Sequence, residues 1–106
     1  MLNWMDSLKG RSMMRLASFT DEEMLNLIDL AAQLKARRAA GVRGDLLHRK
    51  NIALIFEKSS TRTRNSTLIA VRDEGGNGEY LTRPDIHFGK KESVKDTARV
   101  LGRIYD

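Results

Sequence analysis

Serine, threonine and arginine gather in one short stretch, S-S-T-R-T-R at residues 59–64. Hydroxyl groups donate neutral hydrogen bonds, and each guanidinium group of Arg62 and Arg64 is a planar, permanently charged fork that fits phosphate oxygens. The stretch follows an apolar run, N-I-A-L-I-F at residues 51–56, which is typical of a buried strand. Ligands of open α/β sheets bind beyond the carboxyl ends of the strands. The pattern therefore indicates a phosphate-binding turn.

A helix expected directly after this turn would add free backbone N–H groups and the positive end of its dipole. The Gly-rich phosphate loops G-x-x-x-x-G-K-[ST] and G-x-G-x-x-G are absent from the sequence. The alternative is that Ser60 or Thr61 merely caps the helix and that both arginines face water, because capping by serine and threonine is common.

Other kinds of chemistry find less support. The sequence contains no cysteine, which excludes disulfides, thiol nucleophiles and thiolate metal sites. His48 and His87 lie far apart, and no zinc-binding spacing is present. We therefore expect no thiolate or zinc site.

The composition favours a folded domain with an anionic partner. The chain has 106 residues, a net charge of +5, 41% hydrophobic residues and 31% charged residues. This length allows one domain at most. The positive charge suits nucleic acid, an acidic membrane surface or a phosphorylated small molecule. No apolar run approaches the ~20 residues of a membrane span, so no segment is expected to cross a membrane. We take the cytoplasm as the default compartment and expect no membrane partner.

The elements that would position the turn alternate between helix and strand. A helix is predicted from Thr20 to about Ala40, because Thr20 and Glu23 form a T-x-x-E capping box. A strand is predicted at 51–57, a helix from about Thr61 to Glu74, a short strand at 79–82 and a helix from Ser93, where S-x-x-D precedes an apolar pattern. The order α-β-α-β-α implies a parallel sheet with flanking helices. Residues 83–92 form a predicted loop.

The apolar positions predict which side chains pack. The first strand is expected to be covered on both faces, as in a parallel sheet. The expected packing residues are Met24, Leu27, Ile28, Ala31 and Leu34 in the first helix, Leu68, Ala70 and Val71 in the second, and Val94, Ala98, Leu101, Ile104 and Tyr105 in the third.

The motif S-T-R-T-R behind a buried strand strongly resembles the carbamoyl phosphate signature of the carbamoyltransferases. The segments D-I-H-F-G-K-K-E-S at 85–93 and D-T-A-R-V-L-G-R-I-Y-D at 96–106 are similar to those that follow in ornithine carbamoyltransferases. Residues 18–38 look like the first helix of that family. The resemblance covers the chain roughly from Leu8 to Asp106. It implies that no metal or organic cofactor takes part.

This resemblance implies roles for individual residues. Ser60, Thr61, Arg62 and Thr63 would hold the phosphate of carbamoyl phosphate, and Arg62 would also act in catalysis by neutralising charge on the leaving phosphate. In the family, the loop that matches 85–93 reaches into the site of a neighbouring subunit of a homotrimer. His87 would touch the phosphate there, with Lys91 as a weaker candidate.

The resemblance also implies what the chain would lack. Residues 1–106 would be the N-terminal part of an incomplete carbamoyl phosphate-binding domain, without the ornithine-binding domain. The chain alone would then be inactive, whereas the whole enzyme would convert carbamoyl phosphate and ornithine to citrulline and phosphate, in arginine biosynthesis or in ornithine and citrulline metabolism. The helix segment N-S-T-L-I-A-V departs from the commoner C-S-F-E-V-A, and Leu68 stands where glutamate is frequent.

A second reading comes from a different class of protein. The charge of +5 is compatible with a non-catalytic basic module that binds anions or nucleic acid, or with an inactive fragment. Against nucleic-acid binding, the sequence has 1 Trp, 2 Tyr and 3 Phe and no recognisable nucleic-acid motif.

Overall fold

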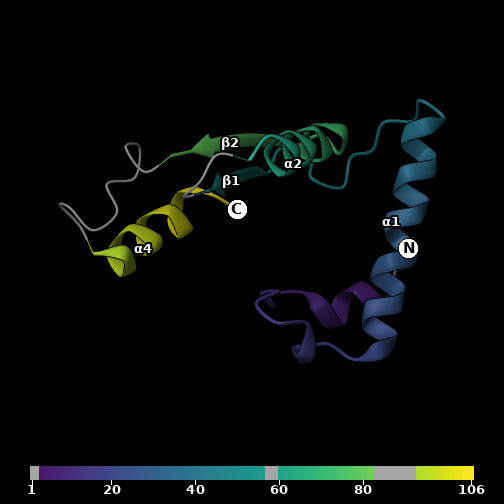
Figure 1. The fold of residues 1–106 in the computed structure, drawn as a ribbon, viewed down its shortest axis with the longest axis horizontal. Helices are drawn as coiled ribbons and strands as arrows, with labels where there is room; N and C mark the ends of the chain where they lie inside the picture. Colours follow the sequence, from purple (N-terminus) through teal and green to yellow (C-terminus); the bar gives the residue numbers. More distant parts are fainter. Residues whose placement is uncertain (1–2, 57–59, 83–92) are drawn as a thin grey trace. The chain divides into compact units, whose positions relative to one another are not determined.

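A computed structural model describes residues 3–56, 60–82 and 93–106, so the predicted loop at 83–92 lies outside the described residues (Figure 1). The chain divides into two compact units, Met1–Val42 and Arg43–Asp106. No described helix has the length and apolar character that crossing a membrane requires.

The first unit consists of two 3₁₀ turns and one long helix. The turns are η1 at Asn3–Leu8 and η2 at Leu16–Ser18, and neither was predicted from the sequence. The helix α1 spans Asp21–Ala39, with Thr20 and Ala40 as its caps, which confirms the predicted helix. The predicted capping box is also confirmed, because the Thr20 hydroxyl accepts from the Glu23 N–H and the Glu23 carboxylate accepts from the Thr20 N–H.

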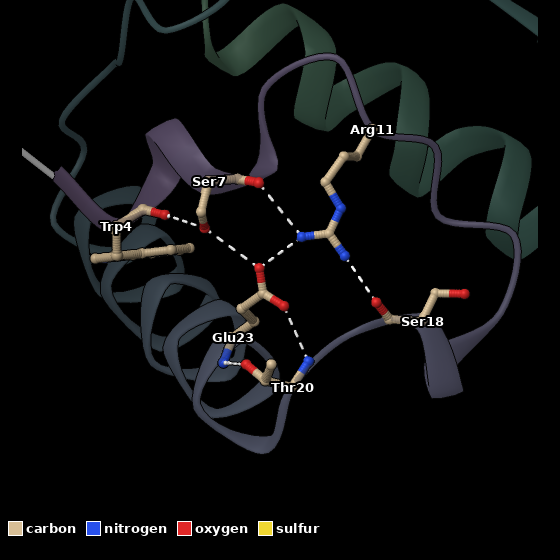
Figure 2. A network of polar contacts seen from close by, with 6 residues as sticks. All are labelled: Trp4, Ser7, Arg11, Ser18, Thr20 and Glu23. Carbon is tan, nitrogen blue, oxygen red and sulfur yellow. Dashed lines mark hydrogen bonds and ion pairs between the residues drawn. The ribbon is translucent and has the colours of Figure 1, made fainter.

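The Glu23 carboxylate is the centre of a polar network around the start of α1 (Figure 2). Besides the Thr20 N–H at 2.9 Å, it accepts hydrogen bonds from the Ser7 hydroxyl at 3.2 Å and the Arg11 guanidinium at 2.6 Å. Arg11 also donates to the Ser18 carbonyl at 2.7 Å. These contacts tie the preceding segment to the first turn of α1.

The expected apolar face of α1 is only partly covered. Met24, Leu27 and Leu34 are half-buried, but Ile28 is 62% exposed and Ala31 is exposed. Among the described residues of this unit no side chain of α1 is buried. The prediction that all five positions pack is therefore wrong, because the two short turns of the unit offer little apolar surface to cover them.

The second unit contains the sheet. Strand β1 at Asn51–Ile55 pairs in parallel with β2 at Asn77–Leu81, and Leu54 lies opposite Tyr80. Helix α2 at Thr61–Asp73 connects the strands, and α4 at Val94–Ile104 follows them. The predicted parallel sheet with flanking helices in the order α-β-α-β-α is confirmed.

Helix α2 packs on the sheet through a small core. Leu54 of β1 and Val71 of α2 are each only 5% exposed. A Cβ atom on Gly78 of β2 would lie 2.8 Å from the Leu68 Cδ2 atom and 3.7 Å from the Val71 Cγ1 atom. Gly78 thus lets both side chains approach the strand. Ala70 is exposed, so its predicted packing role is wrong.

The strand β1 is not covered on both faces. Leu54 is its one buried residue, and the adjacent Ile55, which points to the other face, is 39% exposed. The prediction of two-sided burial is therefore wrong for the described residues. A parallel strand is buried on both faces only where helices cover both.

Helix α4 begins as predicted, because the Ser93 hydroxyl accepts from the Asp96 N–H at 3.1 Å. The face of α4 that is buried differs from the predicted face. The buried residue is Thr97, at 4% exposure, and Leu101 and Tyr105 are half-buried. The other three predicted packing residues are exposed, namely Val94, Ala98 and Ile104. The prediction considered only apolar side chains, whereas the buried face of α4 includes Thr97.

Candidate functional site

The N-cap and the first turn of α2 contain the four predicted phosphate ligands of the motif. Ser60 is the N-cap of α2, with an extended backbone at φ −140° and ψ 109°, and its carbonyl accepts from the Arg64 N–H at 3.2 Å. Ser60 is half-buried, whereas Thr61, Arg62 and Thr63, in the first turn, are exposed. Their exposure leaves the hydroxyls and the Arg62 guanidinium accessible to a ligand. The helix expected directly behind the strand is confirmed.

The N-terminus of α2 differs from those of α1 and α4. In α1 and α4 the N-cap hydroxyl accepts a backbone N–H, and the first turn contains at least one carboxylate. In α2 the Ser60 side chain makes no capping hydrogen bond within the described part of the chain, and the first turn holds no acidic residue. Helix geometry leaves the first N–H groups without an intrahelical acceptor. This helix end therefore offers donors and positive charge to an external anion.

The capping alternative is only partly supported. Ser60 occupies the cap position, yet its hydroxyl does not cap the helix, and Thr61 is already the first helical residue. Arg62 is exposed, as that alternative had it. Arg64, however, does more than face water, because its guanidinium carbon lies 3.8 Å from the centre of the Tyr80 ring.

Tyr80 in turn contacts Phe56, the residue that follows β1. The two ring centres are 5.6 Å apart, with an angle of 73° between the planes, so the contact is edge-to-face. Tyr80 thus contacts both Arg64 of α2 and the residue that follows β1. No role was predicted for Tyr80, which is the second residue of the predicted strand at 79–82. In the structure β2 spans Asn77–Leu81, so Tyr80 lies near its carboxyl end.

The two remaining predicted ligands, His87 and Lys91, lie outside the described residues. Their approach to the phosphate therefore stays a prediction. Within residues 3–56, 60–82 and 93–106, no group of three or more His, Asp or Glu side chains is placed to hold a metal ion.

Comparisons with known proteins agree on one family. Residues 11–106 match the family model described as aspartate/ornithine carbamoyltransferase, carbamoyl-P binding domain. A catabolic ornithine carbamoyltransferase of Bacillus cereus is 52% identical over 106 residues, which are 100% of this chain and 32% of that protein. An ornithine carbamoyltransferase of Limosilactobacillus reuteri is 53% identical over 100 residues, or 94% of this chain and 30% of that protein.

Solved structures show the same similarity. The ornithine carbamoyltransferase from Pyrococcus furiosus superposes with a TM-score of 0.87 at 38% identity, over 93% of this chain and 32% of that one. Aspartate transcarbamoylase from Trypanosoma cruzi, in complex with carbamoyl aspartate and phosphate, gives a TM-score of 0.82 at 32% identity, over 94% of this chain and 32% of that one. This chain thus spans about a third of the length of these relatives.

Proposed function

Because the chain belongs to the aspartate/ornithine carbamoyltransferase family, we propose that it is the carbamoyl phosphate-binding portion of an ornithine carbamoyltransferase. The observation that carries this proposal is the N-terminus of α2, which presents Ser60, Thr61, Arg62 and Thr63. Within the described residues the Ser60 side chain makes no capping hydrogen bond, and the first turn contains no acidic residue. The relatives with identities of 52% and 53% are named ornithine carbamoyltransferases, which favours ornithine over aspartate as the second substrate.

The turn would bind the phosphate group of carbamoyl phosphate. The helix N–H groups and the hydroxyls of Ser60, Thr61 and Thr63 donate hydrogen bonds to its oxygens, and the Arg62 guanidinium adds a charged fork. In the whole enzyme, the δ-amine of ornithine attacks the carbonyl carbon, a tetrahedral anion forms and phosphate leaves. Arg62 then stabilises the charge that builds on the departing phosphate, because its donors are already in place when that charge develops.

The complete reaction requires a second substrate next to the first. Orientation of two substrates supplies much of the barrier lowering in such transfers. We propose that the ornithine-binding part lies outside these 106 residues, so that this chain alone binds carbamoyl phosphate without producing citrulline. The proposed setting is a cytoplasmic homotrimer in arginine or ornithine metabolism, in which His87 and Lys91 reach a neighbouring subunit's site.

The proposal predicts that Arg62→Ala weakens the binding of carbamoyl phosphate. The expected loss is about 2 kcal/mol or more, as for a charged hydrogen bond that is removed. Isothermal calorimetry on the purified 106-residue chain measures it. Arg62→Lys should also bind less tightly, since an ammonium group cannot replace the guanidinium fork.

Arg72→Ala provides the matched control, because it removes the same charge from the last turn of the same helix. It should bind carbamoyl phosphate nearly as well as the unchanged chain. Equal affinity of the Arg62→Ala variant and the unchanged chain would refute the assignment. Tight, salt-sensitive binding of DNA in place of carbamoyl phosphate would instead favour a nucleic-acid module.

A further inference from the structure

Side chains of α2 lie against β2 at two places, Gly78 and Tyr80. At one, Leu68 and Val71 lie over Gly78, whose missing side chain makes room for them. At the other, the Arg64 guanidinium lies over the Tyr80 ring, with its carbon 3.8 Å from the ring centre. Gly78 and Tyr80 are two positions apart in β2, so both residues face the same side of the sheet, the side on which α2 lies.

The spacing of these points is the same on the helix and on the strand. Four residues of a helix, from Arg64 to Leu68, rise about 6 Å. Two residues of a strand, from Tyr80 to Gly78, span about 6.6 Å. The helix and strand run in opposite directions, so both contacts form together without distortion. The stack of Arg64 on Tyr80 thus extends the core packing to the first turn of α2.

The stack determines which way the first turn faces. Successive residues of a helix are separated by about 100°, so Arg62 and Arg64 project about 200° apart. If Arg64 lies on the Tyr80 ring, Arg62 must project away from β2. Phe56 supports the ring from the end of β1 through its edge-to-face contact, so the ring is held from both strands.

We propose that Tyr80 is a positioning residue for the anion site. By stacking on Arg64, its ring sets the rotation of the first turn of α2, and that rotation aims the Arg62 guanidinium and the hydroxyls of the turn at the bound phosphate. Tyr80 itself does not touch the ligand. The proposal rests on the proposed binding of carbamoyl phosphate at this turn.

The first test compares Tyr80→Leu with Tyr80→Phe. Tyr80→Leu removes the ring but stays apolar, and it should weaken carbamoyl phosphate binding about fivefold, which corresponds to the ~1 kcal/mol of a cation–π contact. Tyr80→Phe keeps the ring and should bind as tightly as the unchanged chain. Calorimetry gives both affinities. Equal affinity of Tyr80→Leu and the unchanged chain overturns the proposal, and so does an equal loss in both variants.

A second test asks whether the effect passes through Arg64. Arg64→Met should weaken binding more than Arg72→Met, which removes the same charge from the far end of α2. In the Tyr80→Leu background this excess loss should disappear, because the stack is already absent. An excess loss of the same size in both backgrounds would mean that Arg64 acts on the anion directly, and the positioning role would be wrong.

Ligand-free NMR separates this inference from the proposed function. The Arg62 side-chain Nε–H resonance and the Thr61 and Thr63 amide resonances should move in Tyr80→Leu and stay in place in Tyr80→Phe. Unchanged resonances in both variants overturn the positioning role, whatever the ligand is. If the unchanged chain fails to bind carbamoyl phosphate while the resonances move as expected, the proposed function fails and the control of the turn by Tyr80 stands.

Discussion

The N-termini of α1 and α2 both have a hydroxyl residue at the cap position, but only α1 has acidic residues in its first turn. At α1, Thr20 caps the helix, and the Glu23 carboxylate supplies an internal anion that accepts from the Thr20 N–H and from Arg11. At α2, Ser60 does not cap the helix through its side chain within the described residues, and the position that matches Glu23 is Thr63.

The comparison shows that the N-terminal turn of a helix can either bind a carboxylate of its own chain or remain open to an external anion. Every helix start presents unpaired N–H groups and a partial positive charge. Where the chain supplies its own carboxylate, as at α1, those donors stabilise the local fold. Where the third residue is a threonine and the neighbours are arginines, as at α2, the donors remain for an external anion.

The largest expected effect comes from giving α2 its own carboxylate. Thr63→Glu creates the sequence S-x-x-E and therefore the capping box that α1 has. Carbamoyl phosphate affinity should fall at least tenfold, or about 1.4 kcal/mol, because the carboxylate occupies the donors and repels the phosphate. The thermal midpoint should not decrease, since an acid in the first turn is favourable. Calorimetry and thermal unfolding measure the two quantities.

Thr63→Gln is the control for this substitution, because it has the same shape without the charge. It should retain more affinity than Thr63→Glu. If Thr63→Glu binds carbamoyl phosphate as tightly as the unchanged chain, the N-terminus of α2 is not the phosphate site and the contrast between the two helices has no functional meaning.

The next effect compares the two cap residues directly. Thr20→Ala should destabilise the first turn of α1 by about 1 kcal/mol, because a capping hydrogen bond is lost. Ser60→Ala should cost less than ~0.5 kcal/mol of stability, since the Ser60 side chain makes no capping hydrogen bond within the described residues. The affinity of Ser60→Ala for carbamoyl phosphate should instead fall about fivefold, as expected when one neutral hydrogen bond is lost. Amide hydrogen exchange reports the local stability of each turn.

A reversed outcome would contradict the comparison. If Ser60→Ala opened α2 as much as Thr20→Ala opens α1 and left the affinity unchanged, Ser60 would be an ordinary cap in solution.

The smallest effect is a difference in pH dependence. The hydrogen bond from the Thr20 N–H, followed by those from Arg11 and Ser7, holds the pKa of Glu23 below its ordinary value of 4.5 despite some desolvation. A lowered pKa in the folded state means that the ionised carboxylate stabilises the fold above pH 4.5. This contribution is lost as the pH falls through the lowered pKa.

Hydrogen exchange at the first turn of α1 should therefore become faster as the pH decreases below about 4.5, after correction for the intrinsic exchange rate. Glu23→Gln should remove this dependence. The first turn of α2 has no carboxylate and should lack such a titration. The same acid response in both helices would show that the protein unfolds globally and that the Glu23 network has no local role.

Local signals in the sequence predicted most of the helices and strands. The capping box at Thr20 and the capping hydroxyl of Ser93 placed the starts of α1 and α4, because capping depends on residues within one helical turn. The two strands and α2 were also found, since their patterns are short and continuous. The position of S-T-R-T-R after the apolar run also predicted a phosphate-binding turn, and that function stays a prediction.

The faces of the helices were predicted less well. Burial depends on what lies opposite a side chain, and that partner is distant in the sequence. Ile28 of α1 and Ile104 of α4 have the spacing of packing residues, yet both are exposed. Thr97 is polar by type and is nevertheless buried, because α4 is rotated so that this position faces inward.

The sequence by itself determined the chemistry of this protein: the residues of the turn, their order behind a strand, and the absence of a carboxylate among them. Only the tertiary structure decided how the two arginines of the motif differ. Arg62 and Arg64 have the same side chain, and the contact that distinguishes Arg64 is with the ring of Tyr80, which lies 16 positions beyond it. Leu68 packs over Gly78, and this contact fixes how α2 lies along β2. The contact of Arg64 with Tyr80 therefore arises from the packing of two elements and not from a local sequence pattern.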